Sequence, residues 1–488
     1  MSRAASEAEP GPGRDGTTPL RVLLVTQYFP PEVGAPQARL SETAREWAEA
    51  GLAVTVLTGM PNHPSGIVPA SYRGAARRIE QVDGYRIVRT WLYATPNEGV
   101  ARKTVSHLSF MVSGILLGWR RVGRPDVVVV SSPTFFSLGT AFVLARASRA
   151  RLVVEVRDLW PAIFVELGVL TNQRVIRLLE RIELAAYRAA DAVVTVTEAF
   201  RDDIARRGIP AAKIHVIRNG VDLERFGRTG GPDPAVRARL GAGPGDTLVL
   251  YLGAHGISQG LVSIAQAARR LTLDPVHITF VGDGADRRRL ARTVADLGLV
   301  NVTMLPAVPR DEVPAVIAAA DICLVPLRDV PLFGGFIPSK MFEFLAAGRP
   351  VIGALRGEAA TILRAAGAVV VDPEQPDELA EQIRTLAGDP ARRAAMAAAG
   401  RAYVAAHFDR RALARRYRML IESLTTQPAR PPRGPVAPAQ ALAPEPTTTS
   451  GSERAPEAGV SAVAALAAPA APEAPDAPDA PDAPDAPA

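Results

Sequence analysis

The residues best suited to chemistry lie in one block, positions 333–352, where a loop that contains glycines runs into an apolar helix. Ser339 stands where it could cap that helix, directly after Pro338. Lys340 follows in the first turn, where a positive charge opposes the helix dipole. A bound anion such as a diphosphate would compensate for that opposition. The block therefore predicts an anion-binding helix start.

A carboxylate lies within reach of the same position. Glu343 follows Lys340 by three residues, so both side chains should share one helix face. A carboxylate there can accept hydrogen bonds from both hydroxyls of a ribose. The alternative is a capping box between Ser339 and Glu343, displaced by one position from the usual spacing. The pair Lys340 and Glu343 thus suggests a binding site for a sugar nucleotide.

Two glycine turns come earlier in the chain, each between an apolar run and a helical stretch. The first spans 253–260 and includes Gly253, and the second is formed by Gly282 and Gly284 around an aspartate. Glycine allows backbone N–H groups to approach an anion at the start of a helix. Either turn alone could simply be a tight connection between a strand and a helix. Only the two turns together predict a phosphate-binding site.

A fourth polar segment, residues 155–161, follows a Val-rich run in the first half of the chain. Polar groups at the carboxyl end of a parallel strand face the ligand cleft of an open α/β sheet. Asp158 is therefore a candidate for orienting a sugar or acceptor hydroxyl. A helix N-cap is the alternative role for this aspartate.

These segments need a scaffold, and the hydrophobic pattern predicts parallel sheets. An apolar run at 21–26, a helical stretch at 37–50 and a second apolar run at 53–58 form a βαβ unit. Further buried strands are expected at 86–89, 127–131, 152–156, 192–196, 248–252, 277–281, 302–305, 322–326 and 350–353. Helices are expected at 105–121, 135–149, 174–189, 198–207, 261–271, 285–297, 313–319, 339–347, 390–407 and 410–424. The fold class is α/β, with two Rossmann-like, doubly wound parallel-sheet domains facing a central cleft.

The pattern divides the chain into segments. The expected organisation is a disordered leader (1–18), a first Rossmann-like domain (19–207), a strand and interdomain connection (208–246), a second Rossmann-like domain (247–400), a C-terminal helix (401–424) and a disordered Pro/Ala/Asp tail (425–488). The tail holds three arginines and eight acidic residues, a net charge of −5, so the overall +6 leaves +11 for the rest. A basic body suits phosphate-rich ligands or an anionic membrane.

Composition excludes other classes of protein. A single cysteine, Cys323 within an apolar run, excludes a disulfide framework and suits a reducing cytoplasm. The start of the chain lacks the apolar region of a signal peptide. The longest uncharged apolar stretch, 108–119, would span about 18 Å as a helix, too short for a bilayer. Because basic residues flank this stretch, a monotopic membrane contact and a core helix remain equal alternatives.

Taken together, these motifs resemble the GT4 glycosyltransferases of the GT-B fold. The resemblance rests on the Gly-Asp-Gly turn, the block Ile-Pro-Ser-Lys-Met-Phe-Glu (337–343) with its continuation to Gly-Arg-Pro (348–350), and Val-Ile-Arg-Asn-Gly-Val-Asp (216–222). The stretches Gln-Tyr-Phe-Pro-Pro-Glu (27–32) and Arg-Asp-Leu-Trp-Pro (157–161) are similar to a WbuB-like branch linked to amino-sugar transfer in surface polysaccharide assembly. The resemblance to the GT4 glycosyltransferases covers about residues 20–424.

The resemblance implies a retaining, metal-independent transfer from a nucleotide sugar, UDP-linked by default, to a glycan or lipid-linked acceptor. It implies no cofactor, no nucleic-acid partner, and a cytoplasmic location with a peripheral contact to the inner membrane as a further expectation. The donor would bind at Gly253, His255, Gln259, Gly282, Gly284, Val308, Arg310, Gly335, Phe336, Ile337, Ser339, Lys340 and Glu343. The acceptor would bind at Glu32, Gly34, His63 and Asp158. Asp158, Lys340 and Glu343 would act in catalysis.

The sequence departs from the broad family at two places. Gly335 stands where the family has a glutamate, and Gln259 stands where it has a phosphate-binding lysine. Lys340 is then the main cation, with Arg218 or His255 as auxiliaries. Two alternatives stay open: a nucleotide-sugar 2-epimerase of the same architecture, which needs no acceptor, and a binding protein without activity, motivated by Gly335.

Overall fold

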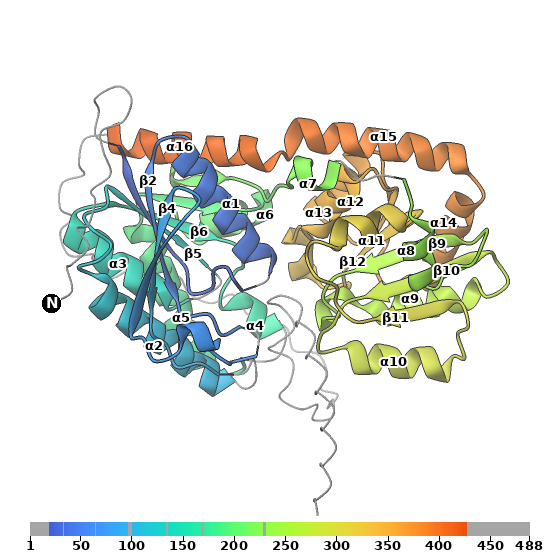
Figure 1. The fold of residues 1–488 in the computed structure, drawn as a ribbon, viewed down its shortest axis with the longest axis horizontal. Helices are drawn as coiled ribbons and strands as arrows, with labels where there is room; N and C mark the ends of the chain where they lie inside the picture. Colours follow the sequence, from blue (N-terminus) through green and yellow to red (C-terminus); the bar gives the residue numbers. More distant parts are fainter. Residues whose placement is uncertain are drawn as a thin grey trace, which may run out of the picture.

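The computed structural model describes residues 19–32, 34–63, 65–95, 100–132, 135–166, 170–227 and 231–426, which form two α/β domains side by side (Figure 1). Each domain has its own sheet, and the chain passes once from the first to the second before its last helix returns. The two-sheet architecture that the hydrophobic pattern predicts is confirmed.

The first sheet has eight strands. In spatial order they are β3 (Arg77–Val82), β4 (Tyr85–Thr90), β2 (Ala53–Gly59), β1 (Arg21–Val25), β5 (Val127–Ser131), β6 (Arg151–Val156), β7 (Ala192–Thr195) and β8 (Ile214–Val216). Neighbours pair in parallel except β3, which runs antiparallel to β4. The expectation of a wholly parallel sheet is therefore wrong at this edge. A two-residue turn at Asp83 and Gly84, both with positive φ, joins the two strands.

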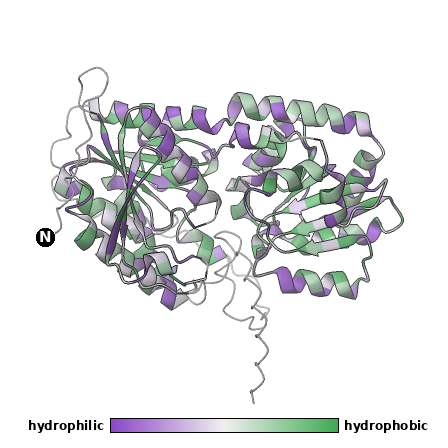
Figure 2. Cartoon of the chain, viewed as in Figure 1, coloured by the Kyte–Doolittle hydropathy of each residue, from purple (hydrophilic) through white to green (hydrophobic). Residues whose placement is uncertain are grey.

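Helices cover both faces of this sheet, because neighbouring strand residues point to opposite sides. Val127 and Val129 of β5 pack under α1 (Ala35–Glu49) and α16 (Arg410–Thr426), while Val128 and Val130 pack under α3 (Ser137–Ser148) and α5 (Gln173–Ala189). The helices of this domain are α1 (Ala35–Glu49), α2 (Val100–Gly118), α3 (Ser137–Ser148), α4 (Ala162–Glu166), α5 (Gln173–Ala189) and α6 (Glu198–Arg206), with short 3-10 turns η1 (Ala70–Tyr72) and η2 (Ala211–Lys213). Apolar residues concentrate on the strands and on the inner helix faces (Figure 2).

The second sheet has six parallel strands. In spatial order they are β11 (Val302–Leu305), β10 (Val276–Val281), β9 (Thr247–Leu252), β12 (Ile322–Pro326), β13 (Val351–Ala354) and β14 (Val369–Val371). The order reverses between β9 and β12, and ligands of open α/β sheets bind at such a switch point. The loop after β9 contains the predicted glycine turn at Gly253. The loop after β12 contains residues 333–339, which we call the donor loop and which lead into Lys340.

The helices around this sheet fill its two faces. They are α7 (Leu223–Gly227), α8 (Pro234–Arg239), α9 (Leu261–Arg270), α10 (Arg287–Asp296), α11 (Val313–Ala319), α12 (Lys340–Ala346), α13 (Glu358–Ala365), α14 (Pro376–Ala387) and α15 (Pro390–His407), with 3-10 turns η3 (Ile257–Gln259) and η4 (Pro331–Gly335). The sequence prediction missed α13, β14 and α14, and it treated the short α7 and α8 as plain connection. Cys323 is fully buried within this domain.

The last helix, α16 (Arg410–Thr426), returns to the first domain and packs on α1 (Figure 1). The Trp47 indole N–H donates to the Ala414 carbonyl at 3.1 Å, and the Trp47 and Tyr417 rings meet edge to face at 5.2 Å. At the crossing, Val221 and Phe408 are joined by a backbone hydrogen bond of 3.0 Å. The last described helix thus completes one face of the first domain's core.

Candidate functional site

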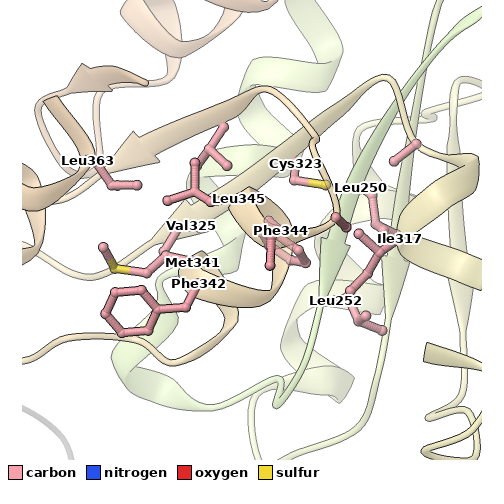
Figure 3. Packing of buried hydrophobic residues seen from close by; sticks show 14 of the residues in the cluster. Leu250, Leu252, Ile317, Cys323, Val325, Met341, Phe342, Phe344, Leu345 and Leu363 are labelled. Carbon is pink, nitrogen blue, oxygen red and sulfur yellow. The ribbon is translucent and has the colours of Figure 1, made fainter. Parts of the chain in front are cut away.

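Helix α12 presents Lys340 and Glu343 as a pair because its other residues are needed for packing. Met341, Phe342, Phe344 and Leu345 are buried in the core below it (Figure 3). The two polar residues, three positions apart, are left on the remaining face, where both are half-buried. The helical spacing seen in the sequence thus places an amine and a carboxylate together at the switch point of the second sheet.

The Lys340 amine lies against the first glycine turn. Its Nζ donates to the Tyr251 hydroxyl at 2.8 Å and sits 3.9 Å from the centre of the same ring. The Tyr251 hydroxyl in turn donates to the Ala254 carbonyl at 2.5 Å. A Cβ on Gly253, whose φ is +137°, would lie 2.7 Å from the amine. The positive φ therefore favours glycine here, and the absent side chain leaves room for the lysine amine.

Burial changes the charge behaviour of the pair. It lowers the pKa of Lys340 to about 7, an effect that the nearby Glu343 carboxylate partly offsets. The pKa of Glu343 is raised by burial and lowered by the cations around it, first Arg410, then Arg310 and Lys340. Burial prevails and holds the pKa of Glu343 above its ordinary value, although four basic side chains, the three above and Arg225, surround the carboxylate. The amine of Lys340 is poised to gain or lose its proton near neutral pH.

The two glycine turns interlock. A Cβ on Gly282 would lie 1.9 Å from the Gly253 carbonyl oxygen, and a Cβ on Gly284 would lie 2.5 Å from that of His255. The His255 N–H donates to the Asp283 carbonyl at 2.8 Å. Only residues without side chains allow this contact, so the two turns, weak as separate motifs, form one structural unit beside Lys340.

The two predicted auxiliary cations do not fit that role. His255 is fully buried, both ring nitrogens lack a hydrogen-bond partner, and burial lowers its pKa to about 4, so the ring is neutral at pH 7. Arg218 pairs with Glu358 at 2.7 Å and with Glu198 at 3.2 Å. We therefore correct the prediction: the arginine is already neutralised by carboxylates, and the histidine carries no charge.

The other predicted donor residues lie on the second domain. Gln259 ends η3, directly before the left-handed Gly260. Val308 packs on the core of the second domain, and Arg310 donates to Glu42 of α1 at 2.9 Å, so it bridges the domains. Ser339 is half-buried and in helical conformation, but its side chain makes no capping hydrogen bond, so its expected capping role is wrong.

The donor loop contacts the first domain directly. Phe336 meets Phe200 of α6 edge to face at 5.5 Å, and a Cβ on Gly335 would lie 3.2 Å from the Ala199 side chain. Ile337 is half-buried against the core of the second domain. The absent side chain at position 335 therefore gives room for α6 of the facing domain.

Glu358, the first residue of α13, stabilises this contact between the second domain and α6. Its Oε2 accepts from the backbone N–H groups of Glu198 at 2.8 Å and Ala199 at 3.2 Å, which begin α6. Its Oε1 accepts from Arg218 at 2.7 and 3.0 Å. Sequence reasoning missed this carboxylate, because nothing in the chain around position 358 reveals a partner in the other domain.

The predicted acceptor residues lie at the carboxyl ends of strands in the first sheet. Glu32 accepts from the backbone N–H groups of Phe29, Asn62 and His63 at 2.8–3.1 Å. Burial raises its pKa to about 7 although those donors lower it. Gly34 is the residue before α1, and its carbonyl accepts from Ala38 at 3.0 Å. Glu32 thus ties the loop after β1 to the loop after β2, next to His63.

Asp158 lies in a buried charged cluster after β6. Burial raises its pKa, and the neighbouring Arg157 opposes that rise. Arg157 itself is desolvated, which lowers its pKa to about 10, and its Nε and Nη1 have no hydrogen-bond partner. Beside them, Glu155 pairs with Arg39 of α1. The next helix, α4, begins four residues after Asp158, so a role as its N-cap is excluded.

A chain of aromatic rings beside these residues was also missed. Tyr28 packs on His63 at 5.0 Å, and its hydroxyl lies 3.3 Å from Nε2 of His107. Successive ring contacts continue from His107 through Phe136, Phe135 and Trp160 to Phe164. The signal was the recurrence of aromatic residues after the strands β1, β5 and β6. These rings form a platform that suits the apolar faces of a sugar.

Two features that bear on the expected partners are absent from the described residues. Within them, no group of three or more histidine, cysteine, aspartate or glutamate side chains is arranged to hold a metal ion. None of the helices in that same part of the chain is long and apolar enough to cross a membrane.

Comparisons with known proteins agree across most of the chain. The profile of the glycosyl transferase 4-like domain matches residues 34–220, and that of glycosyl transferases group 1 matches residues 233–403. A Mycobacterium tuberculosis protein named GDP-mannose-dependent alpha-(1-6)-phosphatidylinositol monomannoside mannosyltransferase is 30% identical over 407 residues, which cover 80% of this chain and 94% of the relative. WcaI of Escherichia coli K12, assigned to colanic acid biosynthesis, is 27% identical over 378 residues, covering 75% and 91%.

Solved structures share the fold. Sucrose-phosphate synthase from Thermosynechococcus elongatus superposes with a TM-score of 0.66 at 20% identity, over 83% of this chain and 99% of that one. HepE from Anabaena, solved with UDP and glucose, superposes with a TM-score of 0.62 at 18% identity, over 83% and 100%. At these identities the likeness establishes the two-domain architecture.

Proposed function

This chain belongs to the GT4 family of glycosyltransferases with the GT-B fold, and we propose that it moves a hexose or N-acetylamino sugar from a nucleotide diphosphate sugar to a glycan or lipid-linked acceptor. We propose further that the transfer retains the configuration at the anomeric carbon. The placement of Lys340 supports this function most directly, because the amine lies where a diphosphate held by the Gly253 turn would present its charge.

In this proposal the second domain holds the donor. The nucleotide ribose binds Glu343, the diphosphate binds Lys340 and the backbone N–H groups of the two glycine turns, and the sugar lies against residues 335–337. Negative charge develops on the diphosphate as the glycosidic bond stretches towards an oxocarbenium-like state. Donors fixed in advance at that position stabilise the transition state more than the ground state. Lys340 and the backbone N–H groups thereby stabilise the charge on the diphosphate that a metal ion would otherwise stabilise.

The first domain would hold the acceptor. Asp158, Glu32 and His63 offer polar groups at the strand ends, and the aromatic platform beside them offers stacking surfaces. Closure of the cleft aligns the acceptor hydroxyl with the anomeric carbon and excludes water. We propose that the acceptor belongs to surface polysaccharide assembly at the cytoplasmic face of the plasma membrane. The relation to WcaI, assigned to colanic acid biosynthesis, supports this assignment.

A donor panel tests the proposal. We expect a UDP-sugar to raise the melting temperature most; GDP-mannose is the second candidate, because the mycobacterial relative is named for it. Transfer assays with the best donor should then show nucleotide release that depends on an acceptor, with an α-linked product from an α-linked donor. Release without any acceptor, accompanied by a changed sugar, would instead identify an epimerase. Donor binding with no turnover on any acceptor would identify a binding protein.

A further inference from the structure

Helix α2 presents a row of apolar side chains to solvent. Val105, Leu108, Val112 and Leu116 recur every three or four residues, so they share one helix face, and Trp119 continues the row just past the helix. Leu116 is 73% exposed and Val105 is 51% exposed. The opposite face of α2 packs on the sheet beside Leu57. The outer row therefore remains available to a partner.

The row lines a groove. Trp91, which follows β4, joins Val105, Leu108, Val112 and Leu116 around a hollow of about 520 Å³. On the neighbouring α3, Phe142 and Val143 are also exposed, which widens the apolar face. This side of the first domain lies opposite α16 (Figure 1). An exposed apolar area of this extent is typical of an interaction surface.

Positive charge surrounds the apolar row. A second hollow of about 690 Å³ at the end of α2 is lined by Arg77, Arg120 and Arg121 together with Trp119. Residues 99–125 contain five basic residues and no acidic one, and residues 127–154 contain three basic residues and no acidic one. A surface with apolar side chains, an interfacial tryptophan and a hollow whose charged lining residues are all arginines matches an anionic lipid layer.

We propose that this face of α2 docks on an anionic phospholipid bilayer. The apolar row enters the boundary between headgroups and acyl chains, and Arg77 and Arg120 bind lipid phosphates. Two copies of the chain meeting through the same face would bring their arginine groups together, which disfavours a dimer here. In this arrangement Trp119 and the arginines would lie at the headgroup level, where such residues anchor interfacial helices.

The same helix reaches the proposed acceptor site. His107, one residue from Leu108, contacts the Tyr28 hydroxyl at 3.3 Å. A bilayer bound to α2 would therefore present lipid-linked sugars beside the aromatic platform. The lipid-linked acceptor named here rests on the proposed function. The docking of α2 on a bilayer does not depend on that function.

Vesicle sedimentation with the full chain tests the docking. We expect binding to vesicles of phosphatidylcholine with phosphatidylglycerol, and weaker binding to phosphatidylcholine alone. The double variant Val112→Glu/Leu116→Glu should bind at least about tenfold more weakly, because it places two carboxylates in the apolar row. Arg77→Ala/Arg120→Ala should lose roughly fivefold per arginine and become less sensitive to salt.

Matched controls lie in the second domain. Leu273→Glu/Val300→Glu changes two exposed apolar residues, and Arg288→Ala/Arg292→Ala removes two exposed arginines, so neither pair should change vesicle binding. Equal binding by the α2 variants and the wild type would overturn the proposal. So would a dimer in light scattering that the Val112→Glu/Leu116→Glu variant dissociates. Donor-induced melting shifts, measured on every variant, report folding and keep the proposed function separate from this result.

Discussion

Lys340 shares its surroundings with an aromatic ring, a glycine turn and a carboxylate, and has lost most of its water. Its contact with the Tyr251 ring, 3.9 Å from the amine, favours the charged form, whereas burial disfavours it. A diphosphate arriving at the Gly253 turn would supply the missing counter-charge. Donor binding and protonation of this lysine should therefore be coupled.

This coupling predicts how donor affinity depends on pH. The pKa of Lys340 is about 7 in the free protein, so the amine is protonated below pH 7 and neutral above it. Above pH 7, binding a diphosphate must take up a proton, so affinity should fall roughly tenfold per pH unit up to about pH 9. Isothermal titration across this range, in two buffers of different ionisation enthalpy, measures both the affinity and the proton uptake.

The matched variant is Lys340→Arg, whose guanidinium stays charged throughout the range. In this variant the donor affinity should change little with pH, even where that affinity is lower overall. A wild-type profile that is equally flat would show that Lys340 does not meet the diphosphate.

Removing the amine should reduce turnover far more than stability. We expect Lys340→Ala to lower kcat at least about a hundredfold, since a preorganised group at the developing charge contributes roughly 3–4 kcal/mol. Donor-free melting should be unchanged or slightly raised, because the variant no longer buries an amine. Gln259→Ala, in the position of the family's usual phosphate lysine, is a useful comparison. Near-normal turnover in Lys340→Ala would exclude the proposed role.

At the level of elements, the sequence predicts well those strands and helices that are encoded by a continuous pattern of residues. The Val-rich runs of β5 and β6 predict buried parallel strands, and the spacing of Lys340 and Glu343 predicts their shared face. Strand β3 was missed because its residues, Arg-Arg-Ile-Glu-Gln-Val, are almost all exposed at an edge and lack an apolar face. Pairs across the domains, such as Glu358 with Arg218, leave no local pattern that a sequence can reveal.

The contact between α13 and α6 leads to a prediction of its own. Glu358 fixes the start of α6 and Arg218 with four hydrogen bonds, and only 13% of its side chain is exposed. Glu358→Gln should cost about 2–3 kcal/mol, because the amide loses the charge and turns an N–H towards another donor. The urea midpoint should fall, and kcat/KM should fall with it, since the donor loop rests on the same helix through Phe336.

A control separates this contact from a general loss of charge. Glu312→Gln removes a carboxylate whose pair with Arg239 is exposed and lies within the second domain. It should leave the urea midpoint and kcat/KM within error. Equal effects of the two variants would show that the contact between α13 and α6 has no special role.

Over the whole molecule, the two domains are joined by a junction of charged side chains between α1, the second domain and the start of α16. Glu42 of α1 accepts from Arg310 of the second domain at 2.9 Å and pairs with Arg410 at the start of α16. Arg410 also donates to the Gly220 carbonyl at 2.8 Å, next to the passage between the domains. One carboxylate thus connects both domains and the returning helix, close to the predicted nucleotide site.

We expect Glu42→Gln to loosen this junction. The pair with Arg410 is mostly buried, but Arg310 is 37% exposed and screened by solvent, so the loss should be about 2 kcal/mol overall. The cleft should populate open forms more often, which raises the donor-free radius of gyration in X-ray scattering and lowers kcat/KM roughly tenfold. Glu46→Gln, one turn further along α1 and paired with the exposed Arg411, should change neither quantity. A closed-cleft scattering profile in Glu42→Gln, with unchanged kcat/KM, would mean that the α16 packing alone sets the domain arrangement.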